Sequence, residues 1–214
     1  MDAINAADLI RLFDSWKVLF AEKRDELIAL DGKVGDSDLG ITMSKGFAAA
    51  ADAVQAEGEA AGVAKLLRTA GAAMARAAPS TMGTLTATGF IRAGKMLEGS
   101  PALGTRELAV FWAAFRDGVA ERGKAKLGDK TLLDVLHPIA LVMESQAADD
   151  VPLPRALAAA AACATGALEA TKSMKAQHGK AAAFQDKTIG LQDAGATVGM
   201  LIAIRLSDFA SAEP

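Results

Sequence analysis

Hydrophobic residues recur at intervals of three and four along almost the whole chain, which is the spacing of an amphipathic helix. In the first such segment Leu9, Phe13, Trp16 and Phe20 fall on one face, and the pattern continues to an Asp-Gly pair at 31 and 32, a typical helix end. The pattern predicts eight helices joined by short connections, at residues 6–30, 39–55, 62–77, 80–97, 105–121, 131–146, 154–174 and 194–209.

A longer segment, residues 175–193, separates the last two predicted helices and lacks helical periodicity. Structureless segments of this length in a compact domain are usually functional or disordered. Elsewhere the chain has no internal repeat, low-complexity linker or charge block that would mark a boundary. We therefore expect a single all-α domain over residues 1–214.

The composition agrees with a helical fold. Alanine, the best helix former, supplies roughly a quarter of the residues, whereas tyrosine is absent beside 8 Phe and 2 Trp. Strands favour β-branched and aromatic residues, so this composition argues against a large sheet. The charged fraction is 23% and the net charge is −3, which excludes a basic nucleic-acid binder by bulk electrostatics.

The cysteine content and the hydropathy predict a soluble, cytoplasmic protein. The single cysteine, Cys163, excludes an intrachain disulfide framework and fits a reducing cytosol; its alanine-rich surroundings favour a buried thiol over a nucleophile. Residues 1–5 lack the features of a signal peptide. No stretch approaches the roughly 18 uninterrupted apolar residues of a membrane span, so we expect no membrane partner.

Three carboxylates, Asp31, Asp36 and Asp38, stand within eight residues between the first two predicted helices. The glycines interleaved with them, Gly32 and Gly35, allow the backbone to turn the carboxylates toward one point. Converging hard oxygens suit Mg²⁺ or Ca²⁺ better than zinc, although the segment lacks the ligand pattern of an EF-hand. The spacing alone also fits a second interpretation, in which the aspartates are helix caps and a turn residue.

A second candidate site precedes the fourth predicted helix, where Ser80, Thr81, Gly83 and Thr84 follow a proline. Free N–H groups and the positive end of the helix dipole make such a position an anion site. An ordinary Ser/Thr cap is the alternative. Two further segments, residues 122–131 and 175–193, combine glycines with lysines. Taken alone, the first is an ordinary charged loop, whereas the second fits either a phosphate-binding loop or a solvated one.

The two histidines make a poor acid–base pair. His137 precedes a proline within an apolar helix and is expected to be structural. His178 lies in the polar segment 175–193, where it is either a ligand contact or a solvated residue.

Four segments, in this order and spacing, resemble the nucleotide-binding L subunit of dihydroxyacetone kinases. They are residues 30–40, residues 122–134, residues 179–181 and residues 189–196. The resemblance implies a barrel of eight antiparallel helices with the nucleotide and metal at one end. It also implies that Asp31, Asp36 and Asp38 hold two Mg²⁺ ions against the phosphates of ADP or ATP.

The resemblance further implies a set of nucleotide contacts. Leu132 is expected to line the adenine pocket, and Lys180 with Asp193 to close the last loop over the nucleotide. The full expected set is Leu39, Thr42, Ser80, Thr81, Gly83, Thr84, Leu132, Lys180, Asp193 and Gly195.

In this family the substrate is held on a separate K-type subunit, so the chain is expected to be one part of an enzyme. In one branch of the family ADP stays bound and is recharged by a phosphohistidine protein of the phosphotransferase system; in another ATP is exchanged. No residue of this chain is expected to act as the general base, which the resemblance assigns to the partner. A homodimer is left open.

The chain departs from the family pattern around the metal loop. Leu39 and Thr42 stand where His and Asn are usual, and residues 79–84 replace a glycine-rich loop of which only Gly83 is kept. Leu191 and Ala194 replace a usual His and Pro. These departures indicate a divergent member, with a different short ketose or polyol as its substrate.

Three functions remain in view. The first is the Mg²⁺-dependent ATP/ADP-binding subunit of a two-component kinase for dihydroxyacetone or a related ketose. The second is a nucleotide-sensing regulatory or partner-binding paralogue that transfers no phosphate, which the departures motivate. The third is a metal-dependent phosphohydrolase, which fits the aspartates but explains neither residues 189–196 nor the overall register.

Overall fold

A computed structural model describes residues 1–212, and these residues form helices with no strand beyond an isolated bridge between Ile4 and Leu103. The expected all-α class is confirmed. The α-helices are α1 (Ala6–Glu22), α2 (Arg24–Asp31), α3 (Leu39–Glu57), α4 (Gly62–Ala77), α5 (Thr81–Met96), α6 (Thr105–Gly123), α7 (Leu133–Ala148), α8 (Leu153–Ala170) and α9 (Ala194–Ser211). Three 3₁₀ segments are η1 (Glu59–Ala61), η2 (Thr171–Ser173) and η3 (Lys180–Thr188).

The first predicted helix, residues 6–30, is in fact two helices that break at Lys23. The apolar face of α1 is wide, whereas α2 buries only Leu27. At Lys23 the backbone ψ is 1°, away from the helical value of about −42°, although the hydrogen bonds from Lys23 N–H to Leu19 and from Leu27 N–H to Lys23 continue across it. The prediction of one continuous helix was wrong at this residue, because periodicity shows where a helix exists but does not show the backbone angles of a single residue.

The chain between α8 and α9 also differs from the prediction. α8 ends at Ala170, before the predicted end at 174, and continues as the short 3₁₀ segment η2. Residues 175–193 contain η3, which is interrupted at Gln185 by a positive φ of 51°. Cys163 on α8 is half-buried, and desolvation raises the pKa of its thiol, which fits an unreactive side chain.

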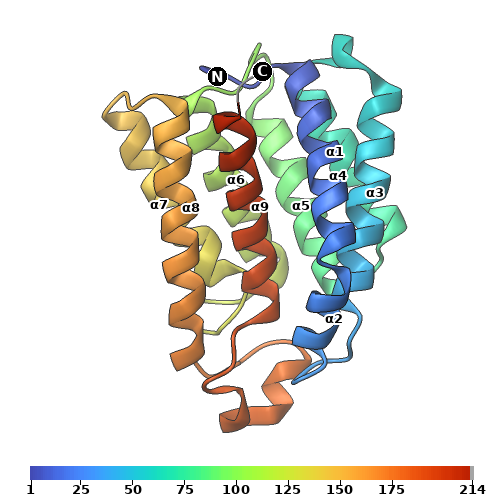
Figure 1. The fold of residues 1–214 in the computed structure, drawn as a ribbon, viewed down its shortest axis with the longest axis vertical. Coiled ribbons are helices and arrows are strands. Elements are labelled where there is room, and N and C mark those ends of the chain that lie inside the picture. Colours follow the sequence, from blue (N-terminus) through green and yellow to red (C-terminus); the bar gives the residue numbers. More distant parts are fainter. Residues whose placement is uncertain (213–214) are drawn as a thin grey trace.

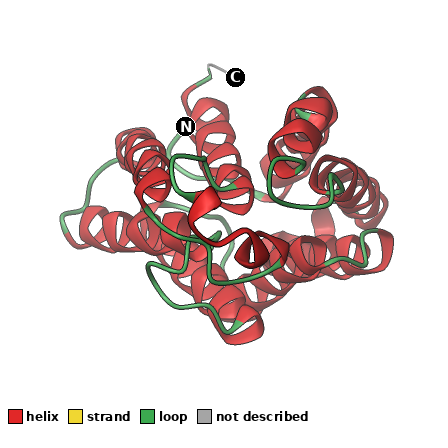
Figure 2. Ribbon diagram, turned by 90° about the horizontal axis from the view of Figure 1, so that it is seen from below, coloured by secondary structure: helices red, strands yellow, loops and turns green. Residues whose placement is uncertain are grey.

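Consecutive helices pack against one another, and α9 also contacts α1, so the order of contacts closes into a ring (Figures 1 and 2). Neighbours run antiparallel. A Cβ added to Gly71 of α4 would meet Ala87 and Ile91 of α5, whereas one added to Gly94 of α5 would meet Ala64 of α4. Residue numbers on the two helices therefore run in opposite directions.

An aromatic cluster fills the interior. The rings of Phe20 and Phe47 are stacked with centroids 4.2 Å apart, and the indole Nε1 of Trp16 donates a hydrogen bond to the carbonyl oxygen of Ile202, joining α1 to α9. All members of the cluster come from α1, α3, α5 and α6: Phe13, Trp16, Phe20, Phe47, Phe90, Phe111, Trp112 and Phe115.

The alternation of direction places the N-termini of α3, α5, α7 and α9 at the same end of the bundle, the lower end in Figure 1. Residues 171–193 cross this end, which Figure 2 views face on. Each of these N-termini presents free N–H groups and the positive end of a helix dipole. The topology therefore makes this end of the molecule favourable for binding anions.

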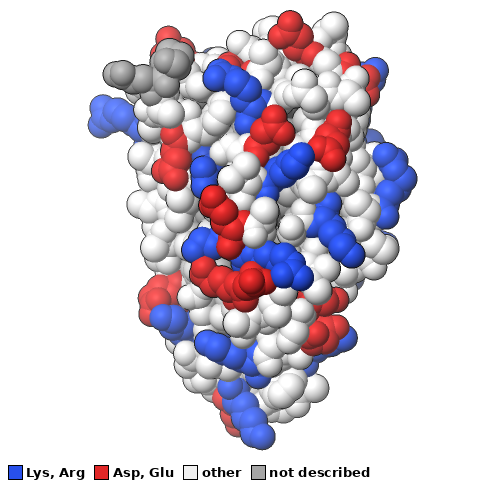
Figure 3. All heavy atoms as spheres, turned by 45° about the vertical axis from the view of Figure 1, so that its right-hand side comes forward, with Lys and Arg blue, Asp and Glu red and all other residues white. Residues whose placement is uncertain are grey.

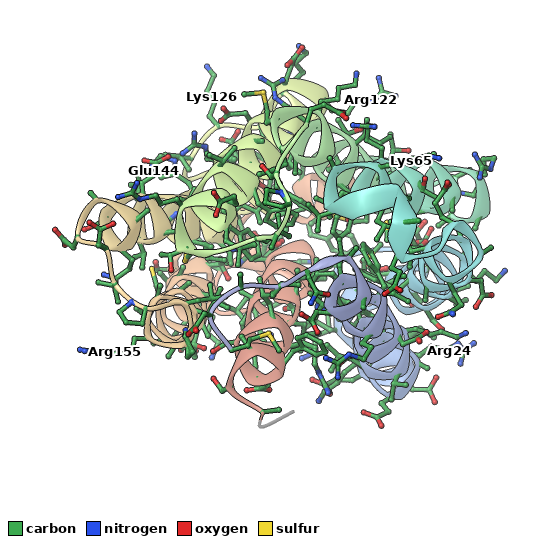
Figure 4. All side chains as sticks on the ribbon, turned by 90° about the horizontal axis from the view of Figure 1, so that it is seen from above. Arg24, Lys65, Arg122, Lys126, Glu144 and Arg155 are labelled. Atoms are coloured by element: carbon green, nitrogen blue, oxygen red, sulfur yellow. The ribbon has the colours of Figure 1, made fainter. Side chains whose placement is uncertain are left out.

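The outer surface carries charges of both signs. Basic and acidic side chains are interspersed on the face drawn in Figure 3, and pairs such as Lys17 with Asp52 bridge neighbouring helices. Figure 4 shows that the labelled charged side chains point away from the bundle: Arg24, Lys65, Arg122, Lys126, Glu144 and Arg155. The face in view is not the basic surface that nucleic acids require.

Helix α9 is long and apolar enough to cross a membrane by length and composition alone, with a mean hydropathy of 1.2 over 18 residues. It is not an uninterrupted apolar run, because it contains Arg205 and Asp208. Half of the helix is buried in the structure, where it packs against α8, α7 and α1. Such burial is what a core helix of the bundle shows.

Candidate functional site

The aspartate loop, residues 31–38, connects α2 to α3 and is folded around the carboxylate of Asp31. Its Oδ2 accepts hydrogen bonds from the backbone N–H groups of Asp38, at 3.0 Å, and Leu39, at 3.4 Å. A Cβ at Gly35 would stand 2.2 Å from Asp31 Oδ1, so only glycine allows this approach. Asp31 thus both closes the loop and belongs to the predicted metal site.

The structure brings the three predicted metal ligands together. One oxygen each from Asp31, Asp36 and Asp38 lie within 4.8 Å of one another. Opposite ligands of an octahedral Mg²⁺ lie about 4 Å apart, so small side-chain rotations would fit the three oxygens to an ion. The side chain of Asp38, although at the N-cap position of α3, makes no capping hydrogen bond, so the capping interpretation does not hold for this carboxylate.

Electrostatics also favour a cation at this cluster. Desolvation raises the pKa of Asp38, and the neighbouring carboxylates of Asp36 and Asp31 raise it further. A bound cation would relieve that repulsion. Two of the three side chains, those of Asp36 and Asp38, are exposed and therefore accessible to an ion from solution.

Lys180 of η3 joins the aspartate cluster, although it stands 144 residues away from Asp36 along the chain. Its Nζ donates to the carboxylate of Asp36, and this hydrogen bond raises the pKa of Lys180. Both side chains are exposed. The contact places the loop between α8 and α9 directly over the predicted metal site.

The segment before α5 is a capped helix N-terminus. Ser80 Oγ accepts a hydrogen bond from the N–H of Gly83 at 3.1 Å, as the capping interpretation expects. A Cβ at Gly83 would stand 2.0 Å from the carbonyl oxygen of Ala78, so this turn too requires glycine. Thr81 is exposed and Thr84 is half-buried, which leaves hydroxyl groups near the start of the helix.

Asp193 caps α9 by accepting a hydrogen bond from the N–H of Ala196 at 2.7 Å. Desolvation raises the pKa of Asp193 to about 6, against the opposing effects of that hydrogen bond and of the Lys130 charge. A Cβ on the next-but-one residue, Gly195, would lie 3.4 Å from Met82 Sδ and 3.6 Å from Leu132 N. The starts of α5, α7 and α9 therefore meet at Gly195.

Four of the predicted nucleotide contacts are buried in this structure: Gly83 and the side chains of Leu39, Thr42 and Leu132. Leu39 and Leu132 belong to the hydrophobic core, with 3% and 2% of their surfaces exposed. Thr42, one turn into α3, is 7% exposed. In this structure the side chains of Leu39, Thr42 and Leu132 have almost no exposed surface with which to contact a nucleotide.

Residues 128–134, which we call the anchor loop, matter more than the sequence indicated. The carboxylate of Asp134 accepts hydrogen bonds from the N–H groups of Gly128, at 2.6 Å, and Thr131, at 2.7 Å. Asp129 Oδ2 lies 2.8 Å from His178 Nε2, so His178 has a protein partner. An aspartate three residues after Thr131, at a helix start, was the available signal for this ordered loop.

Comparison with known proteins agrees with this geometry. The sequence profile of the DAK2 domain matches residues 33–208. The chain is 32% identical over 184 residues to the "PEP-dependent dihydroxyacetone kinase, ADP-binding subunit DhaL" of Escherichia coli, covering 86% of this chain and 87% of that subunit. It is 34% identical over 202 residues to the D-erythrulose kinase of Mycolicibacterium smegmatis, covering 92% of this chain but 34% of that kinase.

Among solved structures, the dihydroxyacetone kinase of C. freundii shares the fold, with a TM-score of 0.72 and 23% identity over 94% of this chain and 34% of that one. The chain thus spans most of the bacterial subunit and about a third of the larger kinases. The resemblance to nucleotide-binding subunits of dihydroxyacetone kinases, first drawn from four short segments, extends over most of the sequence. The chain belongs to the DAK2 domain family.

Proposed function

We propose that this chain is the Mg²⁺-dependent ADP- or ATP-binding subunit of a two-component kinase for a short ketose. The observation that carries the proposal is the cluster of Asp31, Asp36 and Asp38, whose oxygens lie within 4.8 Å of one another at the end where four helix N-termini gather. Carboxylates suited to Mg²⁺ beside N–H groups suited to phosphate are what a nucleotide subunit needs.

In this proposal the three aspartates hold two Mg²⁺ ions, the number that the resemblance implies, and the metal would supply charge neutralisation for the phosphates. Phosphate oxygens lie against the start of α5, where Ser80, Thr81, Gly83 and Thr84 offer N–H and hydroxyl groups. Gly195, at the meeting point of three helices, allows close approach of the ligand. When the nucleotide binds, Lys180 contacts a phosphate oxygen in place of Asp36, and the loop between α8 and α9 thereby closes over the nucleotide.

The ketose is held on a separate K-type subunit, which also provides the general base. Dihydroxyacetone and erythrulose are the candidate substrates, because relatives at 32–35% identity are named as kinases of these two sugars. The phosphoryl donor is either ATP or a phosphohistidine protein of the phosphotransferase system. We also propose a cytoplasmic location, consistent with one unpaired cysteine.

Calorimetry with Mg²⁺ and ADP tests the binding step. Asp36→Asn removes one carboxylate charge from the cluster, and we expect ADP affinity in Mg²⁺ to fall by at least about tenfold, the effect of 1.4 kcal/mol. Asp52→Asn is the matched control, because Asp52 is an exposed aspartate on α3 that pairs with Lys17. Equal affinities for the two variants, or no binding by the wild type, would contradict the proposal.

A phosphate-transfer assay separates the kinase from a regulatory paralogue that binds nucleotide without transferring phosphate. Leu39 motivates that alternative, since it places a buried apolar side chain directly after the last metal ligand. The chain is combined with a K-type subunit, ATP and each ketose, and product is measured for wild type and Asp36→Asn. Transfer that depends on Asp36 supports the kinase, whereas nucleotide binding without transfer supports the regulator.

A further inference from the structure

The loop between α8 and α9, residues 171–193, has little apolar contact to hold it in place. Of its side chains only those of Thr171, Ala176 and Thr188 are buried. A segment with so few buried contacts opens readily unless other interactions order it. Nevertheless, this loop must hold Lys180 at Asp36 and deliver Asp193 to the start of α9.

Lys130, in the anchor loop, supplies such an interaction. It is 4% exposed, and its Nζ donates to the backbone carbonyl oxygens of Met174, at 3.2 Å, Leu191, at 2.6 Å, and Thr188. An ammonium group has three N–H donors, and here all three are used. The acceptors come from the beginning and the end of the loop, so one side chain gathers both parts.

A buried ammonium is costly unless polar groups surround it closely. Desolvation lowers the pKa of Lys130, and the charge of Asp193 opposes that effect. The backbone of Lys130 is also strained, with a left-handed φ of 61°. An apolar side chain could fill the same space without the free-energy cost of desolvating a charge. The ammonium group is therefore explained by the carbonyl oxygens that it binds and not by packing.

The anchor loop is held internally by Asp134. The loop after α8 has internal contacts of its own, since Thr188 Oγ1 accepts from the N–H of Ala176 at 3.0 Å and the carbonyl oxygen of Lys172 accepts from the N–H of Gly190 at 2.7 Å, and it is also joined to the anchor loop. Next to Lys130, the carbonyl oxygen of Asp129 accepts from the N–H of Gln177 at 3.0 Å, and its carboxylate contacts His178. Lys130 and Asp129 of the anchor loop thus both bind residues of the loop after α8.

We infer that Lys130 is a positioning residue for nucleotide binding: its ammonium gathers the carbonyl oxygens of Met174, Thr188 and Leu191 and thereby sets where Lys180 stands over the aspartate cluster. The inference rests on the proposed function for the role of Lys180. Lys130 itself touches no metal ligand and need not touch the nucleotide.

Amide hydrogen exchange on the nucleotide-free chain tests the inference directly. In Lys130→Met, which keeps the volume and removes the donors, we expect amides of residues 174–191 to exchange at least about tenfold faster, while α3 to α6 stay unchanged. Lys126→Met is the matched control, because Lys126 is an exposed lysine just outside the anchor loop. Its exchange should equal that of the wild type.

The rate of ADP dissociation in Mg²⁺ is the second measurement. We expect at least about a tenfold increase for Lys130→Met and none for Lys126→Met. Because hydrogen exchange is read without nucleotide, its result stands even if the wild type binds no ADP. Absence of ADP binding by the wild type would count against the proposed function, whereas unchanged exchange in residues 174–191 would overturn the role of Lys130.

Chemical rescue distinguishes the charge from the volume. Lys130→Cys, made with Cys163→Ser, is alkylated in the unfolded state with 2-bromoethylamine, which restores an ammonium, or with 1-bromopropane, which restores a neutral chain of the same length. Only the ammonium adduct should return loop exchange to the wild-type rate. Equal rescue by both adducts, or failure of every Lys130 variant to fold, would overturn the inference, because Lys130 would then serve packing or the whole fold.

Discussion

At the scale of single residues, desolvation changes the pKa of some of the charged groups at the site. Asp193 illustrates the consequence, because its carboxyl caps α9 while desolvation raises its pKa to about 6. In the unfolded chain an aspartate titrates near its ordinary value of 3.8. Between these two values the folded state binds the proton more tightly, so protonation of Asp193 stabilises the fold as the pH falls.

We therefore expect Asp193→Asn, which keeps a capping oxygen, to gain stability relative to the wild type at pH 7.5 and to lose that gain by pH 4. The two values of pKa differ by about 2 units, which corresponds to about 3 kcal/mol across this range. Urea unfolding of both proteins at several pH values provides the measurement. If the difference in stability between the two proteins did not change with pH, the pKa of Asp193 would not be raised in the folded state.

At the scale of elements, small residues set how closely helices pack. Gly71 of α4 faces α5 so closely that a Cβ would stand 2.7 Å from both the carbonyl oxygen of Ala87 and Cγ1 of Ile91. The abundance of alanine is consistent with close packing of helices. The structure shows that at this crossing even alanine is too large.

Gly71→Ala should therefore destabilise the protein by about 1–3 kcal/mol, the usual cost of overpacking, despite the higher helix propensity of alanine. Gly166→Ala on α8 is the matched control, since a Cβ there would meet nothing within 4 Å, and it should stabilise the protein by about 0.5–1 kcal/mol. Chemical denaturation measures both changes. If alanine changed the stability by the same amount at both sites, the close crossing of α4 and α5 would be refuted.

At the scale of the whole molecule, the ring of helices closes where α9 meets α1. The hydrogen bond from Trp16 Nε1 to the carbonyl oxygen of Ile202, at 3.3 Å, spans this closure. Trp112 is equally buried on α6, but its Nε1 has no hydrogen-bond partner among residues 1–212. The same core thus contains one tryptophan whose indole N–H is hydrogen-bonded and one whose indole N–H is not.

Replacing each tryptophan with phenylalanine should show the difference. Both variants lose volume, but Trp16→Phe also loses a hydrogen bond, whereas Trp112→Phe removes a buried N–H whose desolvation was uncompensated. We expect Trp16→Phe to be more destabilising by about 1–3 kcal/mol. Thermal and urea unfolding give the comparison, and a greater loss for Trp112→Phe would mean that its indole has a partner such as an ordered water.

Much of the site was visible in the sequence because its residues are close together along the chain. Asp31, Asp36 and Asp38 lie in one loop, and Ser80 directly precedes a helix, so local backbone geometry is enough to place them. The break at Lys23, by contrast, is a change in the backbone angle of one residue, which hydrophobic periodicity does not show. The buried states of Leu39 and Leu132 depend on neighbouring helices, which no local pattern specifies.

The sequence by itself determined most of the helices and the all-α class, which follow from periodicity, and the aspartate loop, whose residues are close together along the chain. The family was indicated by the resemblance of four segments. Only the tertiary structure decided that Lys180 meets Asp36, that Gly195 lies where three helices begin, and that Lys130 holds the last loop. The physical reason is that these contacts join residues far apart in the chain. Their formation depends on packing the whole ring, and periodicity carries no information about which distant groups that packing brings together.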